Sequence, residues 1–219
     1  MSDFINDFNR VKQEMRDAVN DDGMIITEHR SGTHILSHYA LKAAAPASKF
    51  YYSHANNVPY MFYVFLTLPD PIEAIKKKWV VVTREDGLRR AISNVIADQT
   101  RAFTSLQRKQ KEPEYDFEKI LHYLHKNYLE TETAKTYLSH YECSTLFTTY
   151  EELCADLNGT VGKILDFLGI EQVNDVSLAD SPFKKQADAT TEEYIQRFLE
   201  DLRHASLDVE LPAIYGDIF

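Results

Sequence analysis

The chain has 219 residues, of which 44% are hydrophobic and 26% are charged, and its formal net charge at pH 7 is −10. This length is enough for one sizeable α/β domain and is short for two. The acidic balance argues against a general binder of nucleic acid or of anionic membranes, because both depend on a basic surface. An anionic ligand would have to be bound by a local group of basic residues.

Cysteine content and the longest apolar runs indicate where the protein is found. The two cysteines, Cys143 and Cys154, do not form a disulfide framework, so they are expected to be packing residues in a reducing compartment. The opening stretch MSDFINDFNRVKQEM lacks the basic flank and apolar core of a secretory signal. The longest apolar run, YMFYVFLTL at 60–68, is too short to span a bilayer. The sequence therefore predicts a soluble, cytoplasmic protein without a membrane partner.

The first part of the chain predicts a helix, a short strand and a second helix. Apolar residues at helical spacing predict an amphipathic helix within 1–22, packed on the domain. Met24, Ile25 and Ile26 form a short buried strand, and a helical pattern then runs from Ile35 to Pro46. Residues 46–59 have the composition of a loop.

The rest of the chain alternates strands and helices. WVVVT at 79–83 predicts a strand covered on both faces. The next helix has one apolar face, made of Leu88, Ile92, Val95, Ile96, Phe103 and Leu106.

One long helix or two abutting helices follow from Asp116, and STLFTTY at 144–150 predicts a third strand. A helix after it stops at Gly169, and the final helix is predicted to begin at Thr190, with Glu193 completing a capping box. The alternation predicts a single α/β domain over 1–219, with ligands at the carboxyl ends of parallel strands.

The stretch EHRSGT at 28–33 lies between the first strand and its helix. Gly32 allows a tight turn, and the N–H groups of the first helical turn would point at an anion. Arg30, Ser31 and Thr33 would add side-chain donors. The stretch lacks the second glycine and the lysine of a nucleoside-triphosphate-binding P-loop, which argues against an ATP-dependent kinase. An ordinary turn with a solvated arginine is the alternative.

A second candidate is TREDGLRRAISN at 83–94. Arg84 ends the strand, and Ser93 lies one helical turn beyond Arg89. Arg89, Arg90, Ser93 and Ala97 share one face beside the apolar stripe. Arg84 and Ser93 could bind a second phosphate. The alternative is a solvated basic face that tolerates a serine.

Together these stretches resemble sulfotransferases that use 3′-phosphoadenosine 5′-phosphosulfate (PAPS). HRSGTHIL resembles the loop that binds the 5′-phosphosulfate, and TREDGLRRAISNVIADQT is similar to the 3′-phosphate segment. The second stretch is closest to the bacterial trehalose sulfotransferase-like branch. TTYEELCADLNGTVGKILDFLGI and PFKKQADATTEEYIQRF match two further blocks of that branch, in the same order.

The resemblance implies a P-loop-like parallel sheet flanked by helices, PAPS as cosubstrate and a small-molecule acceptor. The residues that it implies for the 5′-phosphosulfate are Arg30, Ser31, Gly32, Thr33 and His34. It implies Arg84 and Ser93 for the 3′-phosphate, and Lys184 and Lys185 as a basic position that closes over the cofactor. The chain departs from the branch at His29, where a proline is common, and at His34, which replaces a small hydroxyl residue.

The general base of the family is a glutamate in the loop after the first helix, or a histidine in eukaryotic cytosolic relatives. This chain has no Asp or Glu between His38 and Asp70, and the loop at 46–59 contains one group suited to act as a base near neutrality, His54. We therefore predict His54 as the base, with His34 as the second choice. Arg30 would stabilise charge on the sulfuryl group, and Lys49 is a weaker candidate for that role.

Two pairs of histidines, Trp79 and a group of aromatic residues are further candidates for binding roles. His34 with His38, and His122 with His125, lack a third ligand at a recognised spacing, so no metal site is predicted. Trp79 could stack on adenine, although a core position explains it as well. An aromatic group could line a pocket for a carbohydrate or a phenol, or pack as a core or lid: Tyr51, Tyr52, Tyr60, Phe62 and Tyr63. The alternatives to a sulfotransferase are a nucleotide kinase and a non-catalytic module that binds the cofactor.

Overall fold

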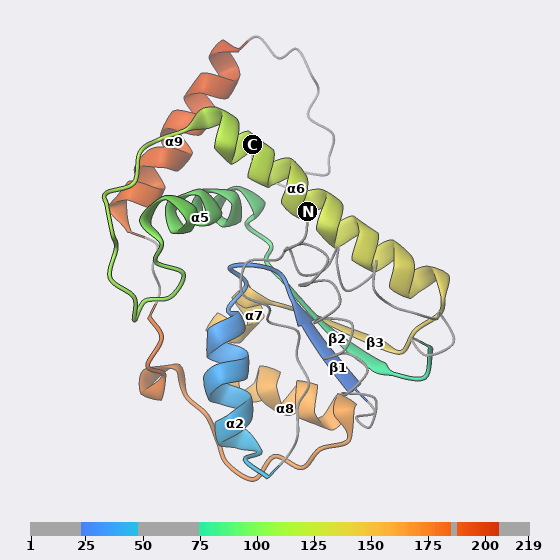
Figure 1. Cartoon of the computed structure of the whole chain (residues 1–219). Coiled ribbons are helices and arrows are strands. Elements are labelled where there is room, and N and C mark those ends of the chain that lie inside the picture. The colour runs from blue at the N-terminus through green and yellow to red at the C-terminus, as the bar shows by residue number, and fades with distance from the viewer. Residues whose placement is uncertain (1–22, 48–74, 185–187, 206–219) are drawn as a thin grey trace, which may run out of the picture. The chain divides into compact units, whose positions relative to one another are not determined.

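The computed structural model describes residues 23–47, 75–184 and 188–205 (Figure 1). The helix predicted within 1–22, the predicted base His54 and the predicted ligand Lys185 lie outside these ranges. The chain divides into two compact units, and each is described by itself. Unit 1 comprises Met1–Thr83 and Glu130–Ser181, and unit 2 comprises Arg84–Leu129 and Pro182–Phe219.

Unit 1 is built on a parallel sheet whose three described strands stand in the order β1-β2-β3. The strands are β1 (Gly23–Thr27), β2 (Lys78–Thr83) and β3 (Thr145–Thr149). In register, Thr27 pairs with Val82, and Thr83 pairs with Thr149. The run from Trp79 to Val82 in the central strand is fully buried, which confirms the strand that its continuous apolar pattern predicts.

Helices cover one face of this sheet. A π-helical stretch at His34–Ala40 continues into α2 (Leu41–Ala44), and α7 (Tyr150–Ala155) and α8 (Leu157–Leu168) follow β3 (Figure 1). Their apolar residues share one core with the strands, made of Ile25, Leu36, Leu41, Val80, Val82, Leu153, Val161, Ile164 and Leu165. The predicted stop of α8 is confirmed, since Gly169 takes a left-handed conformation with φ +76°.

Three helices form the core of unit 2: α5 (Gly87–Thr100), the first part of α6 (Phe117–His140) and α9 (Ala189–His204). The predicted apolar stripe of α5 packs against α6 and α9, in a cluster of Leu88, Ala91, Ile92, Val95, Ile120, Leu124, Tyr194, Phe198 and Leu202. Of the two arrangements left open for 116–141, the structure has the single long helix, whose residues from Glu130 onward belong to unit 1. A short 3₁₀ helix (Leu178–Asp180) lies near the end of unit 1.

Two predicted helix boundaries are wrong. The helix after β2 does not reach Phe103 and Leu106, because Arg101 adopts a left-handed conformation and the helix ends at Thr100. The Thr100 hydroxyl bonds locally to the backbone, donating to the Ile96 carbonyl at 2.7 Å and accepting from the Ala102 N–H at 3.3 Å. Leu106 is consequently 65% exposed rather than part of an apolar face.

The final helix begins before the predicted position. Its N-cap is Asp188, whose carboxylate accepts the Thr191 N–H at 3.2 Å, and the reciprocal capping box joins Asp188 to Thr191 rather than Thr190 to Glu193. An aspartate directly before the helical pattern is as good a cap as a threonine, so local preference alone did not separate the two positions. None of the helices within the described ranges is both long and apolar enough to cross a membrane.

The capping box of α7 generates a prediction about pH. Hydrogen bonds from the Thr148 hydroxyl and the Thr149 N–H lower the pKa of the Glu152 carboxyl below its ordinary value of 4.5. A carboxyl whose folded pKa is lowered stabilises the protein above its unfolded pKa, and this contribution is lost as the pH falls through the folded pKa. We expect Glu152→Gln to lower the free energy of unfolding at neutral pH, and the deficit to shrink at about pH 3.

Urea unfolding at both pH values measures this difference, with Glu171→Gln as a matched loss of one exposed carboxylate in the same unit. A deficit that is as large in acid as at neutral pH would show that the Glu152 carboxylate is not the source.

Candidate functional site

The carboxyl ends of β1 and β2 lie side by side in unit 1. The Glu28 N–H donates to the Val82 carbonyl at 2.9 Å, one residue beyond the last pair of the β1–β2 register. The loop 28–33 therefore leaves the sheet at the edge where β2 ends. Arg84 is the next residue after Thr83 at that end of β2. In parallel α/β sheets this edge is where ligands bind.

The Glu28 carbonyl holds the loop 28–33 in shape. It accepts the Ser31 hydroxyl at 2.6 Å, the Ser31 N–H at 3.4 Å and the Thr33 hydroxyl at 3.4 Å. The hydroxyls of Thr27 and Thr33 are also hydrogen-bonded, with 2.8 Å between their oxygens. Ser31 is fully buried and Thr33 nearly so. Both predicted ligand hydroxyls thus have a role in the loop itself, and their contact with an anion stays a prediction.

Two residues of the loop have left-handed backbones. Arg30 has φ +65° and Gly32 has φ +80°, whereas Thr33 is right-handed with φ −46°. A positive φ is uncommon for a residue with a side chain and marks loops held by their surroundings. Adjacent left-handed and right-handed residues direct successive N–H groups to one side, which is a backbone pattern of anion-binding concavities.

Glycine is required at position 32 for space as well as conformation. A Cβ atom there would lie 2.9 Å from Cδ2 of Tyr150, the first residue of α7. The loop therefore approaches the TTYEEL block as closely as a backbone without a side chain allows. This close approach fits the turn that the sequence predicts around Gly32.

The helix begins directly after the loop, and the Leu36 N–H donates to the Gly32 carbonyl at 2.9 Å. Thr33, His34 and Ile35 therefore lie at the start of the helix, where helices can bind anions. The His34 ring lies 5.1 Å from that of His38, and burial together with the nearby Lys42 lowers the pKa of His38.

Glu28 begins the loop, and no motif in the sequence indicates a role for it. Glu28 is only 2% exposed, and its carboxylate accepts a hydrogen bond from the Thr131 hydroxyl of α6. The carbonyl and the carboxylate of Glu28 therefore fix the loop at two points within unit 1. The signal in the sequence is an acidic residue directly after a buried strand, but its partner lies 103 positions away and has no local pattern.

In unit 2, the predicted 3′-phosphate segment contains Arg84 and Ser93, both half-buried. Arg90 and Ala97, which share the predicted face, are buried, so this face of α5 is not a solvated basic surface. Asn94 is also buried and donates from Nδ2 to Oδ1 of Asn127 at 3.3 Å. The predicted face therefore combines buried residues, Arg90 and Ala97, with the half-buried Ser93.

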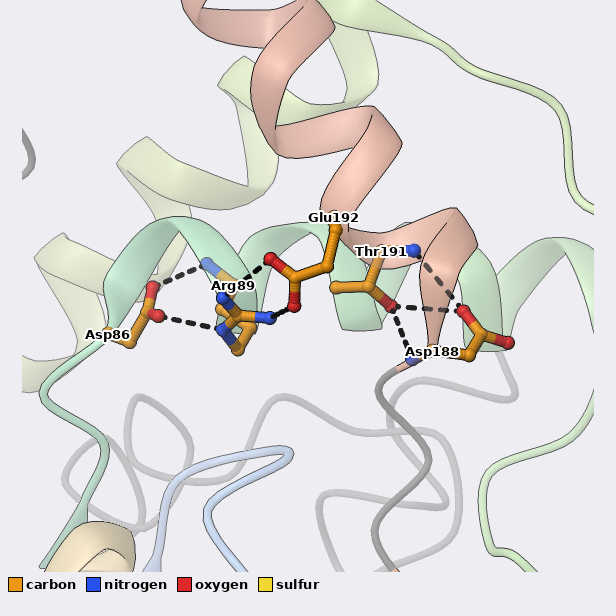
Figure 2. A network of polar contacts seen from close by, with 5 residues as sticks. All are labelled: Asp86, Arg89, Asp188, Thr191 and Glu192. Atoms are coloured by element: carbon orange, nitrogen blue, oxygen red, sulfur yellow. Dashed lines mark hydrogen bonds and ion pairs between the residues drawn. The ribbon is translucent and has the colours of Figure 1, made fainter.

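Arg89 is occupied by two carboxylates (Figure 2). Its Nε donates to the Asp86 carboxylate at 2.9 Å, and its two terminal nitrogens bind the two oxygens of Glu192, one of them at 3.1 Å. The hydrogen bond to Glu192 is the largest of the contacts that raise the pKa of Arg89. Arg89 therefore links α5 to α9 within unit 2 rather than presenting its charge to a ligand.

Lys184 is exposed and lies in unit 2, and its N–H donates to the Ser105 hydroxyl at 2.9 Å. Arg30, Ser31, Gly32 and Thr33 thus lie in the loop of unit 1, and His34 begins the helical stretch that follows it. The residues assigned to the other phosphate and to the basic segment lie in unit 2: Arg84, Ser93 and Lys184. In the described part of the chain, no three His, Cys, Asp or Glu side chains gather in a way that could hold a metal ion.

A small parallel sheet flanked by helices defines an α/β protein. Comparison with protein families gives the particular family: the model of the Stf0 sulphotransferases matches residues 72–201. This is more than half of the chain, and it includes three of the four stretches that carry the resemblance. The chain belongs to the Stf0 sulphotransferase family, and is thereby a transferase of the sulfotransferase class. No curated protein matches the chain.

The geometry at Gly32 predicts a large effect of a single methyl group. Gly32→Ala forces a side chain into a left-handed backbone and against Tyr150, so we expect it to lower the free energy of unfolding by about 1–3 kcal/mol and to distort the loop. Gly87→Ala is the matched control, because its Cβ would be 3.7 Å from the nearest side chain and its backbone is not left-handed. Urea denaturation measures both, and equal stabilities for the two variants would contradict this role of Gly32.

Proposed function

We propose that the chain transfers the sulfuryl group of PAPS to a hydroxyl or amine of a small acceptor. The observation that carries the proposal is the family match over residues 72–201, which spans the segment of Arg84 and Ser93 and the block that contains Lys184. The loop 28–33, with its left-handed residues Arg30 and Gly32, supports the proposal from outside the matched region. The assigned residues come from both units.

The loop 28–33 fits the 5′-phosphosulfate through its backbone. The N–H groups at the start of the helix suit the sulfate and phosphate oxygens, and the guanidinium of Arg30 would add charge. The absence of a Cβ at Gly32, which Tyr150 would otherwise meet, keeps the loop in this shape. In this assignment Ser31 and Thr33 contribute mainly by fixing the loop, and His34 contributes through its N–H.

Arg84 and Ser93 are assigned to the 3′-phosphate, and Lys184 and Lys185 to the basic segment that closes over the nucleotide. An arginine fork and a hydroxyl are a suitable pair for a phosphate monoester. In a chain with a net charge of −10, these few cations are what would bind a strongly anionic nucleotide.

When bound, PAPS supplies an activated sulfuryl group whose bond to the 5′-phosphate oxygen breaks as the acceptor oxygen or nitrogen attacks the sulfur. His54 would remove the acceptor proton, with His34 as the second candidate. Arg30 and the N–H groups of the loop would stabilise charge on the sulfuryl oxygens and on the leaving phosphate. We propose a carbohydrate or a phenol as acceptor. Both cysteines are free, which suits a reaction in the reducing environment of the cytoplasm.

Ligand-dependent stability tests the donor. We expect 3′-phosphoadenosine 5′-phosphate (PAP) to raise the unfolding temperature more than ATP or AMP, because PAP carries the 3′-phosphate assigned to Arg84 and Ser93. A ligand at 100 times its Kd stabilises the folded state by about 2.7 kcal/mol. Arg84→Ala should remove this preference. Arg203→Ala, at an exposed position of α9, is the control and should retain it. Equal or greater stabilisation by ATP would contradict the assignment and favour a nucleotide kinase.

The predicted base is tested separately. His54→Ala should bind PAP within about twofold of the unaltered protein and lose roughly 10²- to 10⁴-fold in transfer, because it removes proton abstraction alone. The measurement follows radiolabelled sulfate from PAPS to a panel of sugars and phenols, with His140→Ala, an exposed histidine at the end of α6, as control. Full activity of His54→Ala would contradict its role and direct attention to His34. A chain that binds PAP but transfers to no acceptor would favour the non-catalytic alternative.

A further inference from the structure

Glu28 is bound through its N–H, its carbonyl and its carboxylate, all within unit 1. Its N–H donates to the Val82 carbonyl of β2 at 2.9 Å, and its carbonyl accepts the Ser31 hydroxyl at 2.6 Å. Its carboxylate accepts a hydrogen bond from the Thr131 hydroxyl of α6. Because the residue is 2% exposed, these contacts are shielded from water. The first residue of the loop 28–33 is therefore bound to β2, to α6 and to the loop itself.

The direction of the Glu28 carbonyl determines the shape of the loop. The same oxygen accepts the Ser31 N–H and the Thr33 hydroxyl, each at 3.4 Å. Between Glu28 and these donors lies Arg30, whose backbone is left-handed with φ +65°. A residue with a side chain keeps such a conformation only where its surroundings hold it. The Glu28 carbonyl supplies this hold, since it ties together the residues before and after Arg30.

The contact with Thr131 limits how the backbone can rotate at Glu28. A residue has only two soft backbone dihedrals. With the N–H held by β2 and the carboxylate held by α6, the rotation about ψ is the main freedom that the Glu28 carbonyl retains. The hydrogen bonds from the loop then fix that rotation. Loss of the Thr131 hydroxyl should thus loosen the point from which the whole loop is held.

We propose that Glu28 and Thr131 are positioning residues for the 5′-phosphosulfate of the donor. This inference rests on the proposed function, in which that group binds at Arg30 and at the start of the helix after the loop. Thr131 holds the Glu28 side chain, and the Glu28 carbonyl holds the loop in the shape that presents those donors. A carboxylate would repel a sulfate in direct contact, so a supporting role is the one that suits Glu28.

The test uses three substitutions in α6. Thr131→Val removes the hydroxyl and keeps the shape of the side chain, whereas Thr131→Ser keeps the hydroxyl. Thr133→Val makes the first change at an exposed position of the same helix. Threonine, valine and serine have similar helix propensities, so α6 should remain folded in all three variants.

Calorimetry measures the Kd of PAP and of adenosine 3′-monophosphate (3′-AMP), which lacks the 5′-phosphate. The ratio of the 3′-AMP Kd to the PAP Kd reports what the 5′-phosphate contributes. We expect Thr131→Val to lower this ratio about tenfold, because a loop that is no longer fixed must be ordered when the phosphate binds. Thr131→Ser and Thr133→Val should leave the ratio within about twofold of the unaltered protein. General damage would weaken both ligands equally, and an unchanged ratio in Thr131→Val would overturn the inference.

A thermodynamic cycle with Glu28→Ala tests whether Thr131 acts through Glu28. In that background the acceptor of the hydroxyl is gone, so adding Thr131→Val should lower the ratio less than about twofold further. A second tenfold loss would count against the inference. If the unaltered protein binds PAP no more tightly than 3′-AMP, the assignment of the loop in the proposed function fails, and the inference fails with it. A clear ratio in the unaltered protein that survives Thr131→Val refutes the inference alone.

Discussion

The candidate site depends on the parallel pairing of β1 and β2. Their register places Thr27 beside Val82, and the next backbone bond, from the Glu28 N–H to the Val82 carbonyl, ends the pairing at the start of the loop. From this point β1 continues into the loop 28–33, whereas β2 continues to Thr83 and then to Arg84. A slip of the register by one residue would shift the start of the loop 28–33 relative to the end of β2. The side chains of β2 from Trp79 to Val82 are all buried, so both faces of this strand are packed.

In both units, polar residues that a motif would assign to the ligand have structural partners. In unit 1, the hydroxyls of Ser31 and Thr33 bond to the Glu28 carbonyl, and the ligand would be left mainly with backbone N–H groups and Arg30. In unit 2, Arg89 lies on the predicted phosphate-binding face, yet its guanidinium bridges Asp86 and Glu192. Fixing such groups in advance lowers the entropy that binding would otherwise cost.

Local sequence patterns were sufficient to predict most of the fold. The buried run at 79–83, the helix stop at Gly169 and the apolar stripe of α5 depend on near neighbours in the sequence, and the structure confirms each of them. The predicted positions for the end of α5 and the start of α9 were wrong. In the first case, the left-handed Arg101 and the Thr100 hydroxyl override an apolar pattern that continues to Leu106. In the second, two adequate caps stood two residues apart, and the Asp188 carboxylate makes the bond.

The parts of the site that could not be predicted depend on distant partners. Glu28 meets Thr131, and Arg89 meets Glu192, each across 103 positions of the chain. No spacing rule connects such pairs, because the turn of a helix or the pleat of a strand relates only residues a few positions apart. The motif around Arg30 and Gly32 identified the loop, whereas the backbone angles that shape it became evident only in the structure.

The proposed function assigns the 5′-phosphate of one nucleotide to the loop 28–33 and its 3′-phosphate to Arg84 and Ser93. The most direct measurement is ³¹P NMR of PAP during titration with the protein, since the 5′- and 3′-phosphorus nuclei give separate resonances. We expect both resonances to shift or broaden together at the same protein concentrations. An unperturbed resonance from either phosphate, while the other responds, would contradict this assignment.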